Sequence, residues 1–270
     1  MKIIVSHDID HITAWEHKNM IIPKHIVRSS IELLTSTLTF KEYSLRIKEL
    51  IENKWHNIEE IMSFNKRHHI PATFFIGMDN GLGLDYSFRN AEIWTKKIYQ
   101  NGFDIGVHGI AYESQDKMKE EYEKMKELLN SSAFGIRMHY LRNSTNTQIQ
   151  LEKCGYLFDT TLRKDINPYK LSTMYEFPLH IMDGDIMYPE NERWMTMGID
   201  ELKELTIQRV NILKNTNIEY MTFLFHDRYF NNSFSIWKEW YMWSINYFES
   251  LGMPFISYSQ AIKELDEKIS

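Results

Sequence analysis

Residues able to bind a metal or to move protons follow several short apolar segments of the sequence. Asp8 and Asp10 end the first such segment, and His108 ends another. Arg137 and His226 each follow a further apolar segment. Because the carboxyl ends of parallel strands meet at one edge of a sheet, we expect these five side chains to converge in one cleft.

The two aspartates stand two positions apart at the end of the first apolar run. Successive residues of a strand point to opposite faces, so both carboxylates are predicted to lie on the same face. Next to a cation, one carboxylate can bind the ion while the other accepts a proton. The alternative is an ordinary turn at the end of a strand, where aspartate is common. The string SHDIDH directly after an apolar run favours the functional interpretation.

Other residues at predicted strand ends offer complementary chemistry. Arg137 and His139 repeat the two-residue spacing, and the guanidinium of Arg137 could hold a carboxylate with its fork of donors. His226 is suited to donate a proton near neutral pH. A strand-end histidine such as His108 is often only a hydrogen-bonded structural residue, and that alternative stays open. Cys154 precedes a glycine at a predicted helix end and is interpreted as a structural thiol.

The elements that must position these residues alternate between strand-like and helix-like patterns. Helical spacing connects most of the apolar runs, which is typical of βα units around a parallel sheet. Seven or eight strands of this kind would form a closed or nearly closed α/β barrel. One domain over residues 1–270 is the simplest interpretation, with 11–66 as a helical insertion or flank after the first strand. Strands are predicted at 2–6, 70–76, 103–107, 133–138, 156–157, 175–181, 220–225 and 254–257, and helices at 43–65, 90–101, 115–129, 144–155, 198–214 and 234–251.

The composition is that of a soluble globular protein, with 43% hydrophobic and 25% charged residues. A net charge of −6 argues against a nucleic-acid partner. The single cysteine excludes a disulfide framework and fits a reducing compartment. No signal-peptide pattern or spanning segment is visible, so we expect a cytoplasmic location. Residues 20–40 predict an amphipathic surface helix, with peripheral contact to a membrane as an alternative.

Five segments together resemble the polysaccharide deacetylase family with the NodB homology domain, also called carbohydrate esterase family 4. SHDID resembles the first motif of the family, and residues 71–75 (PATFF) are close to its second-strand signature. GFDIGVH, ending at His108, resembles the second motif. RMHY, beginning at Arg137, resembles the third, and LFHD around His226 resembles the fifth. The segments occur in the order of the family over residues 1–230.

The resemblance implies a fold, a reaction and a role for individual residues. The fold would be a distorted (β/α)7 barrel of the NodB type, and the reaction a metal-dependent N-deacetylation of a carbohydrate. Asp8 would be the catalytic base, whereas Asp10 and His108 would hold a divalent ion, zinc or a similar metal. His226 would be the catalytic acid, and the backbone N–H of Tyr140 would help to hold the oxyanion.

The sequence also departs from the pattern of the family. Tyr112 stands where the family usually has a further histidine ligand, and His139 replaces the proline of the third motif. His139 could supply the missing ligand or could only contact substrate. The fourth motif is unclear, and Asp159 and Asp183 are candidates to orient Arg137, which is predicted to steer the base.

The predicted function is therefore removal of an acyl group, most simply acetyl, from an amino sugar in surface polysaccharide biosynthesis. A nucleotide sugar, a lipid-linked glycan or an oligosaccharide would fit as the substrate. One alternative is a carbohydrate-binding barrel that has lost its metal chemistry, which the Tyr112 substitution supports. The presence of Asp8, Asp10, Arg137 and His226 together argues against it, because buried charges without a use are costly. A hydrolase of another C–N amide bond is a second alternative, and the sequence leaves the oligomeric state open.

Overall fold

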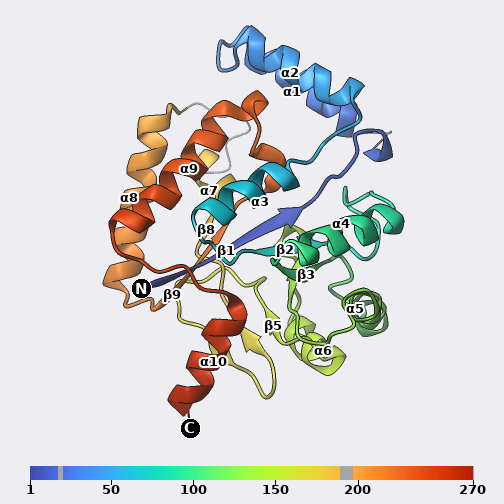
Figure 1. Ribbon diagram of the computed structural model, residues 1–270, viewed down its shortest axis with the longest axis vertical. Coiled ribbons are helices and arrows are strands. Elements are labelled where there is room, and N and C mark those ends of the chain that lie inside the picture. The colour runs from blue at the N-terminus through green and yellow to red at the C-terminus, as the bar shows by residue number, and fades with distance from the viewer. Residues whose placement is uncertain (18–20, 189–196, 270) are drawn as a thin grey trace.

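The computed structural model describes residues 1–17, 21–188 and 197–269 (Figure 1). In this part of the chain nine strands form one sheet in the order β6-β7-β5-β4-β3-β2-β1-β9-β8. Neighbouring strands are parallel, except that β6 runs antiparallel to β7. The strands are β1 (Lys2–Ile9), β2 (Thr73–Ile76), β3 (Asp104–Gly109), β4 (Ile136–Met138), β5 (Phe158–Asp159), β6 (Tyr169–Lys170), β7 (Tyr175–Glu176), β8 (Ile181–Met182) and β9 (Tyr220–Leu224).

Helices surround the curled sheet, and the apolar core lies between the two (Figure 1). The α-helices are α1 (Ile21–Leu34), α2 (Phe40–Ile51), α3 (Ile58–Arg67), α4 (Phe88–Gln100), α5 (Gln115–Leu129), α6 (Thr147–Cys154), α7 (Asp183–Met187), α8 (Ile199–Asn215), α9 (Ser235–Ser250) and α10 (Tyr258–Ile269). Short 3-10 turns are η1 (Trp15–His17), η2 (His139–Leu141), η4 (Asp227–Tyr229) and η5 (Asn232–Phe234). None of the helices in the described ranges combines the length and the apolar character needed to span a bilayer.

The predicted α/β fold with a distorted barrel-like sheet is confirmed, but the sheet stays open. Among the described strands no pairing joins β6 at one edge to β8 at the other. The single strand predicted at 175–181 is wrong, because the chain leaves β7 after Glu176 and crosses to β8 at Ile181. Pro178 lies in the crossing, and proline cannot donate a ladder hydrogen bond.

Three other predicted elements also differ from the structure. The helix predicted at 43–65 is divided into α2 and α3, and Asn53 between them has a left-handed φ of 54°. The helix predicted at 20–40 ends at Leu34, and α2 starts after Thr39, whose hydroxyl and the Glu42 carboxylate form a capping box. The strand predicted at 254–257 is reduced to one isolated bridge between Ile3 and Phe255.

The interior strand β1 sets the place of the site. Its residues Ile3 to Ile9 are buried, and it pairs with β2 on one side and with β9 on the other. The carboxyl end of β1 therefore lies between the carboxyl ends of β2 and β9. The segment that carries η1, α1, α2 and α3 leaves the sheet from this same end.

Candidate active site

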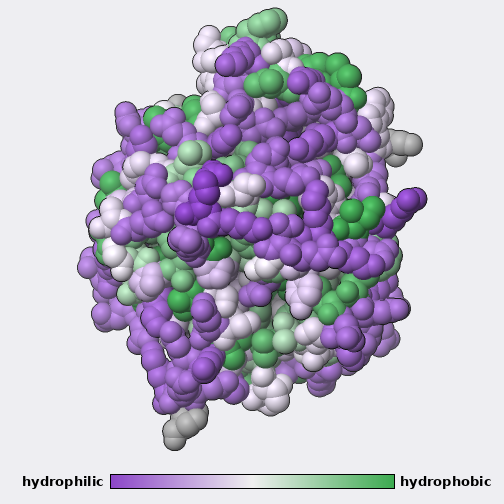
Figure 2. All heavy atoms as spheres, in the orientation of Figure 1, coloured by the Kyte–Doolittle hydropathy of each residue, from purple (hydrophilic) through white to green (hydrophobic). Residues whose placement is uncertain are grey.

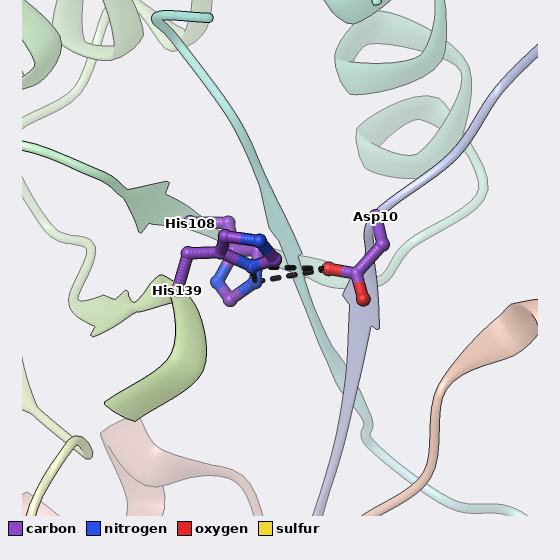
Figure 3. Close-up of side chains that lie close together, drawn as sticks. All are labelled: Asp10, His108 and His139. Atoms are coloured by element: carbon purple, nitrogen blue, oxygen red, sulfur yellow. Dashed lines mark hydrogen bonds and ion pairs between the residues drawn. The ribbon is translucent and has the colours of Figure 1, made fainter. Parts of the chain in front are cut away.

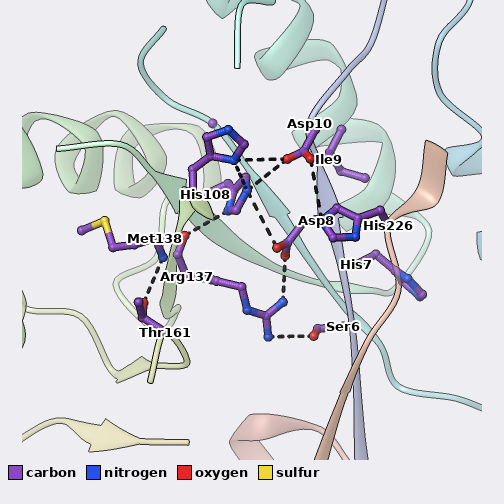
Figure 4. A network of polar contacts seen from close by, with 12 residues as sticks. Ser6, His7, Asp8, Ile9, Asp10, His108, Arg137, Met138, Thr161 and His226 are labelled. Carbon is purple, nitrogen blue, oxygen red and sulfur yellow. Dashed lines mark hydrogen bonds and ion pairs between the residues drawn. The ribbon is translucent and has the colours of Figure 1, made fainter. Parts of the chain in front are cut away.

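The carboxyl ends of β1, β3, β4 and β9 bring the predicted residues together around one pocket (Figure 4). The pocket has a volume of about 340 Å³. Arg137 lies next to it and is fully buried. The lining includes Asp8, Asp10, His108, His139, Tyr140 and His226. The structure thus places all the predicted site residues within one region, although they are far apart in the sequence.

Asp8 is a buried carboxylate held by an arginine. Nη1 of Arg137 donates to Oδ1 of Asp8 at 2.8 Å, and Nη2 donates to the hydroxyl of Ser6 at 2.9 Å. Burial alone would raise the pKa of Asp8, but the charges of Arg137 and His108 outweigh it and lower that pKa. Oδ2 of Asp8 lies 3.8 Å from Nε2 of His108, so this oxygen faces the other site residues. Asp8 is therefore ionised and aimed at the pocket.

The carboxylates predicted to orient Arg137 mainly have other partners. The described bonds of its guanidinium, besides those to Asp8 and Ser6, go to Thr160 and to the hydroxyl of Tyr258. Burial lowers the pKa of Arg137, but Asp8 raises it, and Asp159 adds a smaller effect in the same direction as Asp8. Asp159 itself accepts a hydrogen bond from Thr161. The prediction that Asp183 orients Arg137 is wrong, because Asp183 contacts His226.

Two histidine rings present one ring nitrogen each to the same point. Nδ1 of His108 donates to the backbone carbonyl of Arg137 at 3.0 Å, and Nε2 of His139 donates to the carbonyl of Leu82 at 3.2 Å. A carbonyl can only accept, so in the neutral rings the other nitrogens carry lone pairs. These two nitrogens lie 3.0 Å apart, and each faces Oδ1 of Asp10, at 3.1 Å from His108 and 3.4 Å from His139 (Figure 3).

This donor set fits a divalent cation. The ligand atoms of Asp10, His108 and His139 all lie within 4.8 Å of one another. Three electron-pair donors directed at one point repel each other unless a positive charge lies between them, and two imidazoles with a carboxylate are a usual set for zinc. The carbonyl groups behind both rings fix the rotation that such a site requires. Burial would lower the pKa of His108, but the negative charges of Asp8 and Asp10 raise it. The same negative charges would favour the binding of a metal ion.

His226 is oriented by a carboxylate that the sequence did not connect with it. Its Nδ1 donates to Oδ1 of Asp183 at 2.9 Å, and its backbone N–H donates to Oδ2 of Asp183 at 2.7 Å. Burial would lower the pKa of His226, but Asp183, with help from Asp10, raises it to about 10. Nε2 lies 3.7 Å from Oδ2 of Asp10, on the side of the pocket. Asp183 follows the two-residue strand β8, and this strand-end position is the one feature of the sequence that indicates a site residue here.

The backbone turns sharply where the third motif ends. Tyr140 and Leu141 both have left-handed φ angles, of 56° and 52°, which are costly for residues other than glycine. The Tyr140 side chain is 68% exposed, and its ring lies 3.9 Å from that of His139 between centroids. Tyr112 is not among the residues that line the pocket, and its hydroxyl accepts from Arg142 at 3.2 Å.

Two neighbours of the site residues serve the core instead. His7 is fully buried. Its Nδ1 forms a hydrogen bond with the carbonyl oxygen of Phe225 at 2.8 Å, and its Nε2 forms one with the side-chain amide of Asn65 at 2.9 Å. Asp227 accepts from the backbone N–H of Asn57 at 2.8 Å, ahead of α3. Both side chains therefore bond to the scaffold of the pocket and are not among the residues that line it.

A buried glutamate anchors the loop that follows His108. Oε1 of Glu121, in α5, accepts from the backbone N–H of Ile110 at 3.0 Å. Burial raises the pKa of Glu121 to about 7. The unfolded chain ionises this group nearer 4.5, so ionisation favours unfolding as the pH rises from about 4.5 to about 7. Below that window Glu121 is protonated in both states and the penalty is absent.

We expect Glu121→Gln to remove this pH dependence. Relative to the variant, the wild type should lose about 3 kcal/mol of unfolding free energy between pH 4.5 and pH 8, because one pKa unit corresponds to about 1.4 kcal/mol. Urea titrations of both proteins at the two pH values, in the same chelating buffer, measure the difference. An equal stability difference at both pH values would show that folding does not raise the pKa of Glu121.

Among the comparisons with known proteins, the one with solved structures finds proteins similar to this chain. No family model matches the chain, and no curated protein sequence matches it significantly. A crystal structure from Mycobacterium smegmatis, provisionally assigned as a polysaccharide deacetylase, matches with a TM-score of 0.65 and 14% identity over 99% of this chain and 90% of that chain.

Two further solved structures align with the chain at lower similarity. A 4-α-glucanotransferase from Thermococcus litoralis matches with a TM-score of 0.50 and 10% identity over 97% of this chain and 38% of that chain. A CE4 family pseudoenzyme from Bacillus anthracis matches with a TM-score of 0.48 and 13% identity over 96% of this chain and 64% of that chain. The chain thus has the NodB-like fold of the polysaccharide deacetylases, and the resemblance to that family is confirmed at the level of the fold.

Proposed function

We propose that the protein is a metal-dependent N-deacetylase that acts on an amino sugar of a glycan or glycan precursor. The observation that carries the proposal is the convergence of two imidazole nitrogens on Asp10, with Asp8 held by Arg137 and His226 held by Asp183 beside them. The fold alone does not assign an activity. The proposal therefore rests on the donor set and on the opposite charges of the flanking acid and base.

Each residue has a distinct part in the proposed hydrolysis. A divalent ion, most simply zinc, held by Asp10, His108 and His139 would polarise the amide carbonyl and activate a water molecule. Asp8 takes the proton of the attacking water, and its ion pair keeps it ionised. The backbone N–H of Tyr140 stabilises the oxyanion that forms.

His226 completes the reaction at the nitrogen. Asp183 keeps its imidazole protonated and holds Nδ1, so Nε2 is the atom that gives its proton to the leaving amine. The acetyl group then leaves as acetate, and the amino sugar leaves with a free amine. Asp8 and His226 thus act at opposite ends of the scissile amide.

The cavities around the site favour a substrate longer than one sugar. A second cavity of about 430 Å³ shares Arg163 and Met182 with the pocket of about 340 Å³. Its two arginines are already paired, Arg163 with Asp185 and Arg209 with Asp165. Paired arginines can still donate hydrogen bonds to sugar hydroxyls. Their charge is largely neutralised, so they attract phosphates only weakly. We therefore favour a lipid-linked glycan or an oligosaccharide over a nucleotide sugar, in surface polysaccharide biosynthesis, and the cytoplasmic location stays a prediction.

Acetate release from N-acetylglucosamine oligomers tests the proposal. We expect release by the protein loaded with one zinc ion per chain, loss after dialysis against a chelator, and recovery when zinc is added back. Asp10→Ala, which lacks a proposed ligand, should not recover. Zinc-loaded protein that binds the oligomers but releases no acetate would favour a carbohydrate-binding barrel. Release of another acyl group alone would favour a different amide hydrolase.

A further inference from the structure

The α1–α2 hairpin turns polar side chains toward the body of the protein. The buried residues of α1 are Ser29 and Glu32, and those of α2 are Arg46 and Glu49. A surface helix normally buries its apolar stripe and exposes its charges. In this hairpin the usual arrangement is reversed on both helices.

A network of buried contacts fixes this orientation. Arg46 donates to Glu32 at 2.6 Å through Nη1 and to the carbonyl of Ser233 at 3.0 Å through Nε. Glu49 accepts from the hydroxyl of Ser233 at 2.6 Å and pairs with Nη2 of Arg228 at 2.7 Å. Ser233 and Arg228 belong to the segment after β9. Rotating either helix would leave these charges buried without partners, which is costly.

The opposite face of the hairpin is apolar and exposed. Leu34, Ile51 and Phe40 are 84%, 76% and 75% exposed, the largest fractions for any large hydrophobic side chain in the described ranges. Val27 is 59% exposed and stands seven residues before Leu34, on the same helix face. Figure 2 shows green, hydrophobic side chains over the hairpin at the top of the view. A surface of this kind indicates an apolar partner.

The charge of the hairpin indicates what that partner is. Residues 21–51 contain five basic and three acidic side chains, a net charge of +2, which leaves −8 for the rest of a chain of −6. Lys24 and Lys41 are exposed, and the exposed Lys48 lies 3.4 Å from Glu52, whereas Glu32 and Glu49 are buried. Two copies meeting through this face would bring like charges together. Apolar side chains flanked by lysines are instead typical of helices that lie on anionic lipid.

We propose that the outward face of the hairpin, formed by Val27, Leu34, Phe40 and Ile51, docks on an anionic lipid surface. The hairpin follows Asp10 along the chain and leaves the sheet from the carboxyl end of β1. Docking would therefore hold the pocket near the lipid headgroups. If the proposed deacetylase function also holds, the substrate is an amino sugar carried on a lipid.

Vesicle co-sedimentation of the full chain tests the docking surface. We expect binding to vesicles of phosphatidylglycerol and phosphatidylcholine, and weak binding to phosphatidylcholine alone. The double variant Leu34→Gln and Phe40→Gln should bind at least about tenfold more weakly, because two apolar side chains no longer enter the lipid. The matched control, Ile93→Gln with Ile149→Gln, changes side chains that are 49% and 50% exposed on α4 and α6 and should bind like the wild type.

Several outcomes would overturn the proposal. These are no binding by the wild type, equal binding by the double variant, or equal binding to both kinds of vesicle. Dimers that the double variant abolishes, seen by light scattering without vesicle binding, would assign the face to a second copy. Lys41→Glu tests the charge if the double variant does not fold, and it should also weaken binding. Vesicle binding needs no turnover, and acetate release from soluble oligomers needs no lipid, so the two proposals can fail separately.

Discussion

Replacing Asp8 with asparagine is expected to remove most turnover while the protein keeps its metal. The amide cannot accept the proton of the attacking water, and a general base typically contributes about a hundred- to ten-thousand-fold in rate. The proposed ligand atoms belong to Asp10, His108 and His139 and are unchanged by this substitution. The measurement is kcat for acetate release together with the metal content of the purified variant.

His226→Ala serves as the comparison for this variant. It should also keep the metal, but its defect should shrink on an activated acyl analogue whose leaving group needs no proton. The Asp8→Asn defect should stay the same on both substrates, because water must be deprotonated in either case. Near-normal turnover of Asp8→Asn with unchanged metal content would show that Asp8 is not the base.

Replacing His139 with alanine is expected to remove the metal. Its Nδ1 lies 3.0 Å from Nε2 of His108 and faces Asp10, so the substitution deletes one of three proposed ligands. Changes in residues that only support ligands cost about 10- to 100-fold in metal affinity, so loss of a ligand should cost at least about 100-fold. Calorimetric zinc titration of the metal-free proteins measures the change.

Tyr112→Phe is the matched control for the third ligand. Tyr112 stands at the position where the resemblance implies a histidine, but its hydroxyl bonds to Arg142. A phenol must also lose a proton before it can bind a metal well, whereas a neutral imidazole need not. We therefore expect wild-type zinc affinity for Tyr112→Phe. Full affinity in His139→Ala with loss in Tyr112→Phe would exchange the two assignments.

The positions of most candidate site residues could be predicted from the sequence, because they depend on local rules. An apolar run that ends in Asp8 and Asp10, or in His108, marks the end of a buried strand. Parallel strands then bring their carboxyl ends together whatever the chain does between them. Arg137 and His226 follow from the same rule, which is why widely separated segments meet at one pocket.

Contacts that depend on short or irregular segments were not predictable in this way. Asp183 reaches His226 from the end of β8, a strand of two residues that gives no periodic signal. The carbonyl of Leu82 selects the tautomer of His139 from a loop in which Leu82 itself has a left-handed φ of 57°. Such contacts join residues that are distant in the sequence, so only the folded chain brings them together.

The α1–α2 hairpin shows this division most clearly. The sequence by itself determines that each helix has an apolar side and a charged side, because that follows from residue spacing. It predicts burial of the apolar side, since burying hydrocarbon is favourable and burying charge is costly. The tertiary structure decided otherwise, because Arg228 and Ser233 offer ion-pair and hydrogen-bond partners to Arg46 and Glu49. Those partners offset the cost of burying the charges and leave the apolar side facing outward.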